Sequence, residues 1–201
     1  MASKAFKGMS EVDPQDSRAP RLGCGFHVVE ITSAKIFETR KKGDAVIVEF
    51  RVLASNGHAE HGEPKPAHKP GGDASLYIQI TGREPQIYQR EVKSLILAAL
   101  GVDLRDEAGK AKLAQWDAAD AWTTAPKGQA CLIDRCLPDN ESKSALVGWV
   151  LAVWGKPNKS FTNYFYEVWN AEREERDGLP VFDAANPPPQ PDRRPAKDDD
   201  E

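Results

Sequence analysis

The chain has 201 residues, 40% of them hydrophobic, which suits one sizeable core with loose ends rather than two domains. It has no window of about 18 apolar residues and no apolar signal-peptide run, so we expect a cytoplasmic protein without a membrane partner. The net charge is −4, but residues 1–170 hold 22 Lys and Arg against 21 Asp and Glu, so the acidity lies in residues 171–201. Three cysteines are an odd number for a disulfide framework, and we expect them to be thiols.

Composition divides the chain into three parts. Residues 1–22 mix charges with prolines and show no hydrophobic period, which predicts a mobile leader. Residues 23–170 carry the periodic segments and form the expected domain. Residues 171–201 end in a run of Pro, Asp, Arg and Lys with little to bury, so we expect a flexible, proline-rich acidic tail.

Three strands are expected in the first half of the domain. Residues 26–37 are rich in β-branched and aromatic residues, and the basic connection after them has Gly43 placed for a turn. Residues 45–55 alternate in hydrophobicity and predict a second strand with one buried face. Residues 56–73 contain four glycines and three prolines, which predicts a long exposed loop. Residues 74–81 alternate again and predict the third strand.

Helices and a hairpin are expected in the second half. Residues 85–100 have apolar side chains at helical spacing, with Pro85 at the first helical position and Gly101 as the stop. A weaker pattern predicts a short helix around Leu113 and Trp116, and residues 128–137 are interpreted as a fourth strand. Residues 144–170 hold two apolar, aromatic segments about a Gly-Pro-Asn turn, which predicts a β-hairpin.

The order of these elements is strand, strand, strand, helix, strand, strand, which is the order of an OB-fold. The predicted fold is therefore mainly β with one or two helices: an OB-fold-like, five-stranded Greek-key barrel with long loop insertions. Such barrels bind oligonucleotides on one face, with help from the connecting loops.

The sequence resembles phage-type single-stranded-DNA-binding proteins over residues 23–170 and the tail. The resemblance depends on the opening "GFHVVEITSAKIFETRKKGDAVIVEFRVL", the helix end "VKSLILAALGV", the segment "GKPNKSFTNYFYEVW" and the terminal "DDDE". It implies non-sequence-specific binding of single-stranded DNA, with RNA as an alternative ligand, in replication, recombination or repair. It also implies that the tail regulates binding or recruits replication or recombination proteins through Asp198, Asp199, Asp200 and Glu201, and it leaves room for a homo-oligomer. The tails of that family usually close with an aromatic residue, whereas this chain ends at Glu201, so recruitment here would depend on charge.

A non-specific binder of single strands needs a basic track beside aromatic faces. On the last strand Tyr164 and Tyr166 share one face, while Phe161, Phe165 and Trp169 share the other, and only one face can be core. Since a tyrosine hydroxyl tolerates water, we expect Tyr164 and Tyr166 to face outward. The candidate nucleic-acid-binding residues are Arg40, Lys41, Lys42, Lys65, Lys69, Tyr77, Trp154, Lys156, Lys159, Phe161, Tyr164 and Tyr166.

Other functions have weaker support. His58, His61 and His68, with Cys131 and Cys136, fit no zinc-ligand spacing, so neither a metal nor another cofactor is expected. The chain has no phosphate-binding loop and no nucleophile elbow, so an enzyme is not expected, and the acidic residues that a metal-dependent nuclease would need are scattered. The main alternative is a β-barrel adaptor that binds proteins only, because nucleic-acid binders often have a pI above about 9 and this chain has one near 5.7.

Overall fold

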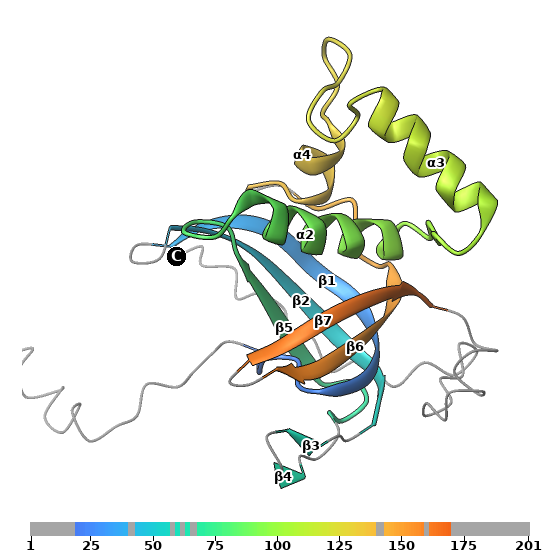
Figure 1. Ribbon diagram of the computed structural model, residues 1–201. Helices are drawn as coiled ribbons and strands as arrows, with labels where there is room; N and C mark the ends of the chain where they lie inside the picture. Colours follow the sequence, from blue (N-terminus) through green and yellow to red (C-terminus); the bar gives the residue numbers. More distant parts are fainter. Residues whose placement is uncertain are drawn as a thin grey trace, which may run out of the picture.

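The computed structural model describes residues 19–39, 43–56, 59–60, 63–64, 68–139, 143–158 and 161–169 (Figure 1). Five strands form one antiparallel sheet: β1 (Gly25–Thr39), β2 (Gly43–Ser55), β5 (Asp73–Gln79), β6 (Val150–Asn158) and β7 (Phe161–Val168). The helices of this part are α2 (Pro85–Ala99), α3 (Glu107–Ala118) and α4 (Leu132–Cys136), and a separate strand pair is formed by β3 (Ala59–Glu60) and β4 (Glu63–Pro64). None of these helices is long and apolar enough to cross a membrane.

The mainly-β, OB-fold-like prediction is confirmed, with three described helices and a sheet that is not a closed barrel. The strand order is β5-β2-β1-β6-β7. β1 is central: it pairs with β2 from His27 to Thr39 and with β6 over Gly25 to Glu30. β5 and β7 are the two edges, and no pairing between them is seen in the described part. In Figure 1 α2 lies across one end of the curved sheet, and the β3–β4 pair lies beyond the other end.

The opening between β5 and β7, which we call the seam, is filled by residues 19–22. The Leu22 amide donates to the Ser75 carbonyl over 2.9 Å, and the Ser75 amide donates to the Pro20 carbonyl over 2.8 Å. From the other edge, the Tyr164 hydroxyl donates to the Leu22 carbonyl. Leu22 is 1% exposed and belongs to the core. The expectation of a mobile leader is therefore wrong for residues 19–22; residues 1–18 lie outside the described part.

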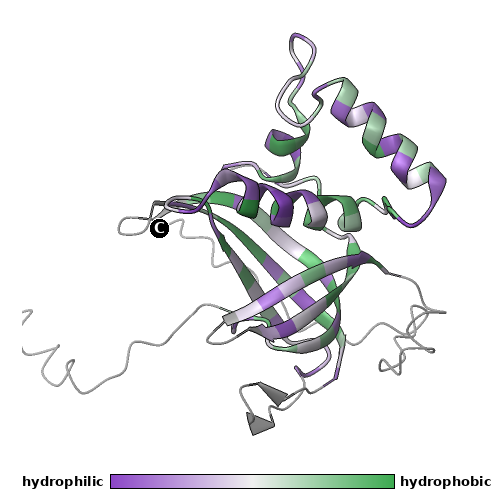
Figure 2. Cartoon of the chain, viewed as in Figure 1, coloured by the Kyte–Doolittle hydropathy of each residue, from purple (hydrophilic) through white to green (hydrophobic). Residues whose placement is uncertain are grey.

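Residues that the periodicity of the sequence predicts to face inward are buried in the core. Val46, Val48, Phe50 and Val52 are all buried on one face of β2, as their alternation predicts. α2 begins with Pro85 and contributes a buried face that packs mainly against β7, with Val92, Leu95 and Ile96 in the core. α3 has only Gly109 buried, and in Figure 2 it alternates between hydrophilic and hydrophobic residues along its length.

The predicted fourth strand at residues 128–137 is wrong. Residues 132–136 are α4, which begins after Cys131, whose sulfur accepts a hydrogen bond from the Asp134 amide over 3.4 Å. Asp134 and Arg135 are both exposed, and two adjacent exposed charges fit one side of a helical turn better than an alternating strand. Cys131 and Cys136, on either side of this turn, are both buried, and burial raises the pKa of the Cys136 thiol to about 11. The fourth strand of the sheet is β6.

Candidate nucleic-acid interface

The outer face of β1, β6 and β7 carries a row of aromatic side chains. On β6, Leu151 and Val153 are buried in the core, so the alternation directs Trp154 to the outer face. The strand register pairs Phe26 of β1 with Trp154, and Trp154 with Phe165 of β7. Lys156 lies two residues after Trp154 and therefore on the same face. We call Phe26, Trp154, Lys156 and Phe165 the ring row.

The side chains of the ring row are in contact with one another. The Phe26 and Trp154 rings are stacked, with centroids 4.7 Å apart and planes 18° from parallel. The Lys156 ammonium lies 3.5 Å from the Trp154 centroid and 5.2 Å from the Phe165 centroid. Because Phe26 covers one face of the indole, the ammonium at 3.5 Å must lie over the other face, which is the face toward Phe165. The Trp154 and Phe165 centroids are 6.3 Å apart with planes 50° from parallel.

These contacts hold the ring row in position on the rigid sheet. An aromatic pair contributes about 0.5–1.5 kcal/mol beyond its buried area, and a cation over a ring about 0.5–2 kcal/mol. Phe165 is nevertheless 46% exposed, so one flat ring remains available to solvent. Adjoining rings and a cation are the groups that stack bases and attract phosphates.

The structure brings some predicted residues together here and not others. Trp154 and Lys156 belong to the ring row. Lys69 is exposed and follows His68, whose backbone and ring contact Ser55 and Gly23, so it lies at the same end of the sheet. The prediction missed Phe26 and placed Phe165 in the core. The cross-strand pairing that joins these two rings to Trp154 could have found them, but it depends on a register that the sequence alone does not give.

The prediction that Tyr164 and Tyr166 face outward is wrong, because both side chains face the core. Tyr164 is buried, and its hydroxyl is satisfied by the Leu22 carbonyl. Tyr166 packs against the core, and its hydroxyl has neither exposed surface nor a hydrogen-bond partner of normal length in the described part. Burial, with the nearby Glu91 carboxylate, raises the pKa of Tyr166 well above its usual value. Both tyrosines face the core and are unavailable to a base.

Tyr77 faces outward, as its parity predicts, since Leu76 and Ile78 are buried on either side of it. It lies opposite Ile47 on the β2–β5 side of the sheet, away from the ring row on β1, β6 and β7. Its side chain is half-buried, and its hydroxyl has no exposed surface and no partner among the described residues. Tyr77 is therefore not part of the ring row.

Several predicted residues lie outside the described part: Arg40, Lys41, Lys42, Lys65, Lys159, the side chain of Phe161, and the tail residues Asp198, Asp199, Asp200 and Glu201. The strand ends that flank residues 40–42 are described. Thr39 pairs with Gly43 at the far end of the 15-residue β1 from Phe26. The ends of the basic connection are therefore not next to the ring row.

A closed ring of hydrogen bonds joins the start of β1 to the end of β2. The Gly23 amide donates to His68 Nε2 over 3.1 Å, and the His68 amide donates to Ser55 Oγ over 3.1 Å. His27 completes the ring, with Nδ1 2.9 Å from Ser55 Oγ and Nε2 3.0 Å from the Gly23 carbonyl. A carbonyl only accepts, so the His27 proton is on Nε2 and Nδ1 accepts from Ser55. Burial lowers the pKa of His27 to about 4 and also lowers that of His68.

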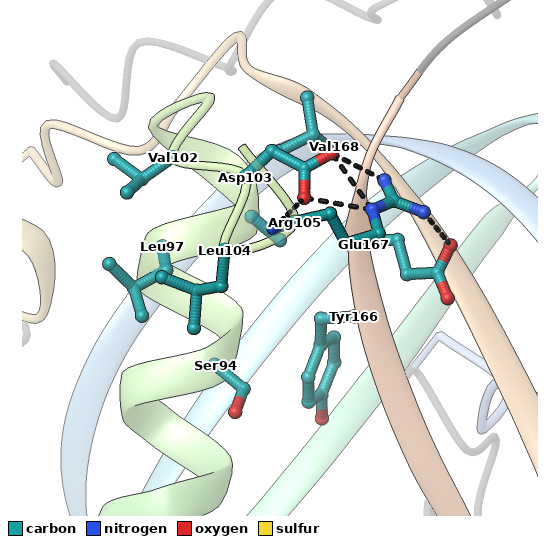
Figure 3. A pocket seen from close by; sticks show the side chains of 10 residues that line it. Ser94, Leu97, Val102, Asp103, Leu104, Arg105, Tyr166, Glu167 and Val168 are labelled. Carbon is teal, nitrogen blue, oxygen red and sulfur yellow. Dashed lines mark hydrogen bonds and ion pairs between the residues drawn. The ribbon is translucent and has the colours of Figure 1, made fainter. Parts of the chain in front are cut away.

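A cavity of about 230 Å³ lies between the end of α2, residues 102–105 and β7 (Figure 3). Its apolar lining includes Leu97 and Val168. At its rim Arg105 forms ion pairs with Asp103 and, over 3.6 Å, with Glu167. Because both carboxylates neutralise Arg105, this rim offers no free cation to a phosphate, and the cavity is too small for an oligonucleotide.

No protein-family model matches the sequence, and no match was found among curated proteins. In the described part of the chain, no three His, Cys, Asp or Glu side chains come together as metal ligands.

Proposed function

We infer that this protein binds single-stranded DNA without sequence preference, with RNA as an alternative ligand, through the outer face of β1, β6 and β7. The observation that carries the proposal is the ring row, in which an exposed ring, a sandwiched indole and a cation adjoin on an OB-fold-like sheet. Every base has a flat face, so stacking of this kind is tolerant of sequence, and it needs no catalytic group.

The charge of Lys156 supports this assignment. Among the described residues Lys156 forms no ion pair and contacts rings, so no acid of the described part neutralises its charge. Five other cations of the described part are paired with acids, whereas several, such as Lys69 and Lys112, form no ion pair within that part. The paired cations are Arg51, Arg83, Lys93, Arg105 and Lys110. A cation that is not paired with an acid has no ion pair to break before it contacts a phosphate oxygen.

The proposal also covers the setting of the protein. It acts in the cytoplasm, of a bacterial host if it is phage-encoded, on strands exposed during replication, recombination or repair. The acidic residues 171–201 oppose binding by competing with DNA for cations, or attract replication or recombination proteins. Such Coulomb effects reach about 10 Å at 0.1 M salt, so the tail must act close to the domain.

The test is the substitution Phe165→Ala, because Phe165 is the most exposed ring of the row. Loss of one stacked base should weaken binding to an oligo-dT by about 1–3 kcal/mol, measured by fluorescence anisotropy of a labelled oligomer. Phe37→Ala is the matched control, since Phe37 is 36% exposed on β1 but near the opposite end of that strand. Equal affinities of the two variants, both folded by circular dichroism, would remove the ring row as the interface.

A protein-binding adaptor is the second candidate, favoured by the near-balanced charge of residues 1–170. The same titration separates the two functions. A single-strand binder has an affinity for oligo-dT that falls steeply as salt is raised, whereas an adaptor has no affinity for the oligomer at any salt concentration.

A further inference from the structure

The ammonium of Lys156 lies beside the space between Trp154 and Phe165, which we call the slot. The slot is bounded by two rings with centroids 6.3 Å apart, and the ammonium lies 3.5 Å from one and 5.2 Å from the other. Phe26 covers the far face of Trp154 at 4.7 Å. Among the described residues, the face of the indole that no stacked ring covers is therefore the face that the Lys156 ammonium contacts.

The geometry points to an exchange in the slot: a nucleobase enters between Trp154 and Phe165, and the displaced Lys156 ammonium moves to an adjoining phosphate. This inference rests on the proposed function and assigns the order of events at the same site. In the absence of a ligand, Lys156 keeps the slot closed.

The slot must widen and one of its rings must turn before a flat base fits between them. Two rings that sandwich a base stand about 7 Å apart, twice the optimal carbon–carbon separation, and the centroids of the slot are 6.3 Å apart. The planes are 50° from parallel, so one ring must turn. Phe165 is half exposed on an edge strand and can turn, whereas Trp154 is held by the stacked ring of Phe26.

Each group in the exchange replaces one favourable contact by another. The indole loses a cation–π contact and gains a stacked base, and both contacts use the same face of the ring. The ammonium loses a ring and gains a phosphate, without having to break an ion pair in the described part. The phosphate contact of Lys156 should therefore form only when a base is present to displace it.

The test compares oligo-dT with an abasic deoxyribose-phosphate oligomer of the same length, for the full chain and for Lys156→Gln. The logarithm of the affinity is plotted against the logarithm of the salt concentration, where each phosphate contact to a single strand contributes a slope of about 0.7. Lys156→Gln should lower the slope by about 0.7 on oligo-dT and leave it unchanged on the abasic oligomer. Lys69→Gln is the matched control, an exposed lysine at the same end of the sheet without a ring contact in the described part, and should change both slopes alike.

The outcomes separate the two proposals. If the unaltered chain binds neither oligomer, single-strand binding fails, and the exchange fails with it. If the chain binds oligo-dT but Lys156→Gln changes both slopes equally, Lys156 is an ordinary phosphate contact and only the exchange is wrong. If neither slope changes, Lys156 never leaves the slot and the exchange is again wrong. Phe165→Ala provides a second measurement: it should weaken oligo-dT binding about 5- to 150-fold and abasic binding not at all.

Discussion

The hydrogen-bond ring at His27 predicts how stability depends on pH. His27 is 2% exposed, and burial lowers its pKa from 6.5 to about 4. Between pH 6.5 and about pH 4 the His27 imidazole is therefore protonated in the unfolded chain and neutral in the folded chain. The free energy of unfolding consequently falls as the pH is lowered through this range. The loss is complete below about pH 4, where both states are protonated. At about 1.4 kcal/mol per pH unit, the loss is about 3 kcal/mol.

The measurement is urea unfolding from pH 7 to pH 4, for the natural chain and for His27→Gln, whose amide does not titrate. The two plots of unfolding free energy against pH are subtracted from each other, because other titrating groups also make stability depend on pH. The lowered pKa of His68 acts in the same direction as that of His27, whereas burial raises the pKa of Glu91, which favours the folded state as the pH falls. Parallel curves for the two proteins would refute the reasoning. If His27→Gln does not fold, the chemical shift of the His27 ring in the natural chain should titrate near pH 4.

Two further predictions concern the contacts that Leu22 and Gly23 make with β6 and β7. Gly155→Ala should lower the free energy of unfolding by about 1–3 kcal/mol, because a Cβ at this position would lie 2.5 Å from the Gly23 carbonyl oxygen. Gly23→Ala is the control and should be tolerated, since its Cβ would lie 3.7 Å from the His68 ring. Equal melting temperatures of the two variants would contradict the close approach. Tyr164→Phe should cost about 1–3 kcal/mol by leaving the Leu22 carbonyl without its donor, and an unchanged midpoint in urea would show that this bond does not hold the seam.

The sequence predicts elements whose signals are local. The alternation in β2 and the spacing in α2, with Pro85 at its start, depend only on neighbouring residues, and the structure confirms both. The prediction of a strand over residues 128–137 is wrong because the five residues of α4 are too few to distinguish a helical turn from a strand by periodicity.

The orientation of β7 could not be predicted because both of its faces carry aromatic residues. The argument that tyrosines prefer water fails once a buried hydroxyl has a partner. For Tyr164 that partner is the Leu22 carbonyl, which is 142 residues away in the sequence. The ring row could not be predicted for a similar reason, since the register of three strands brings Phe26 and Phe165 to Trp154.

The seam also bears on the synthesis of the chain. Residues 19–22 leave the ribosome long before β7, and the Tyr164 hydroxyl that donates to the Leu22 carbonyl emerges only after most of the chain has been made. Contacts between such distant residues form slowly, because a long loop must close first. Until translation reaches β7, the sheet of the nascent protein lacks its last strand and the contact between Tyr164 and Leu22. The protein should therefore depend on chaperones more than one whose early segments fold against each other.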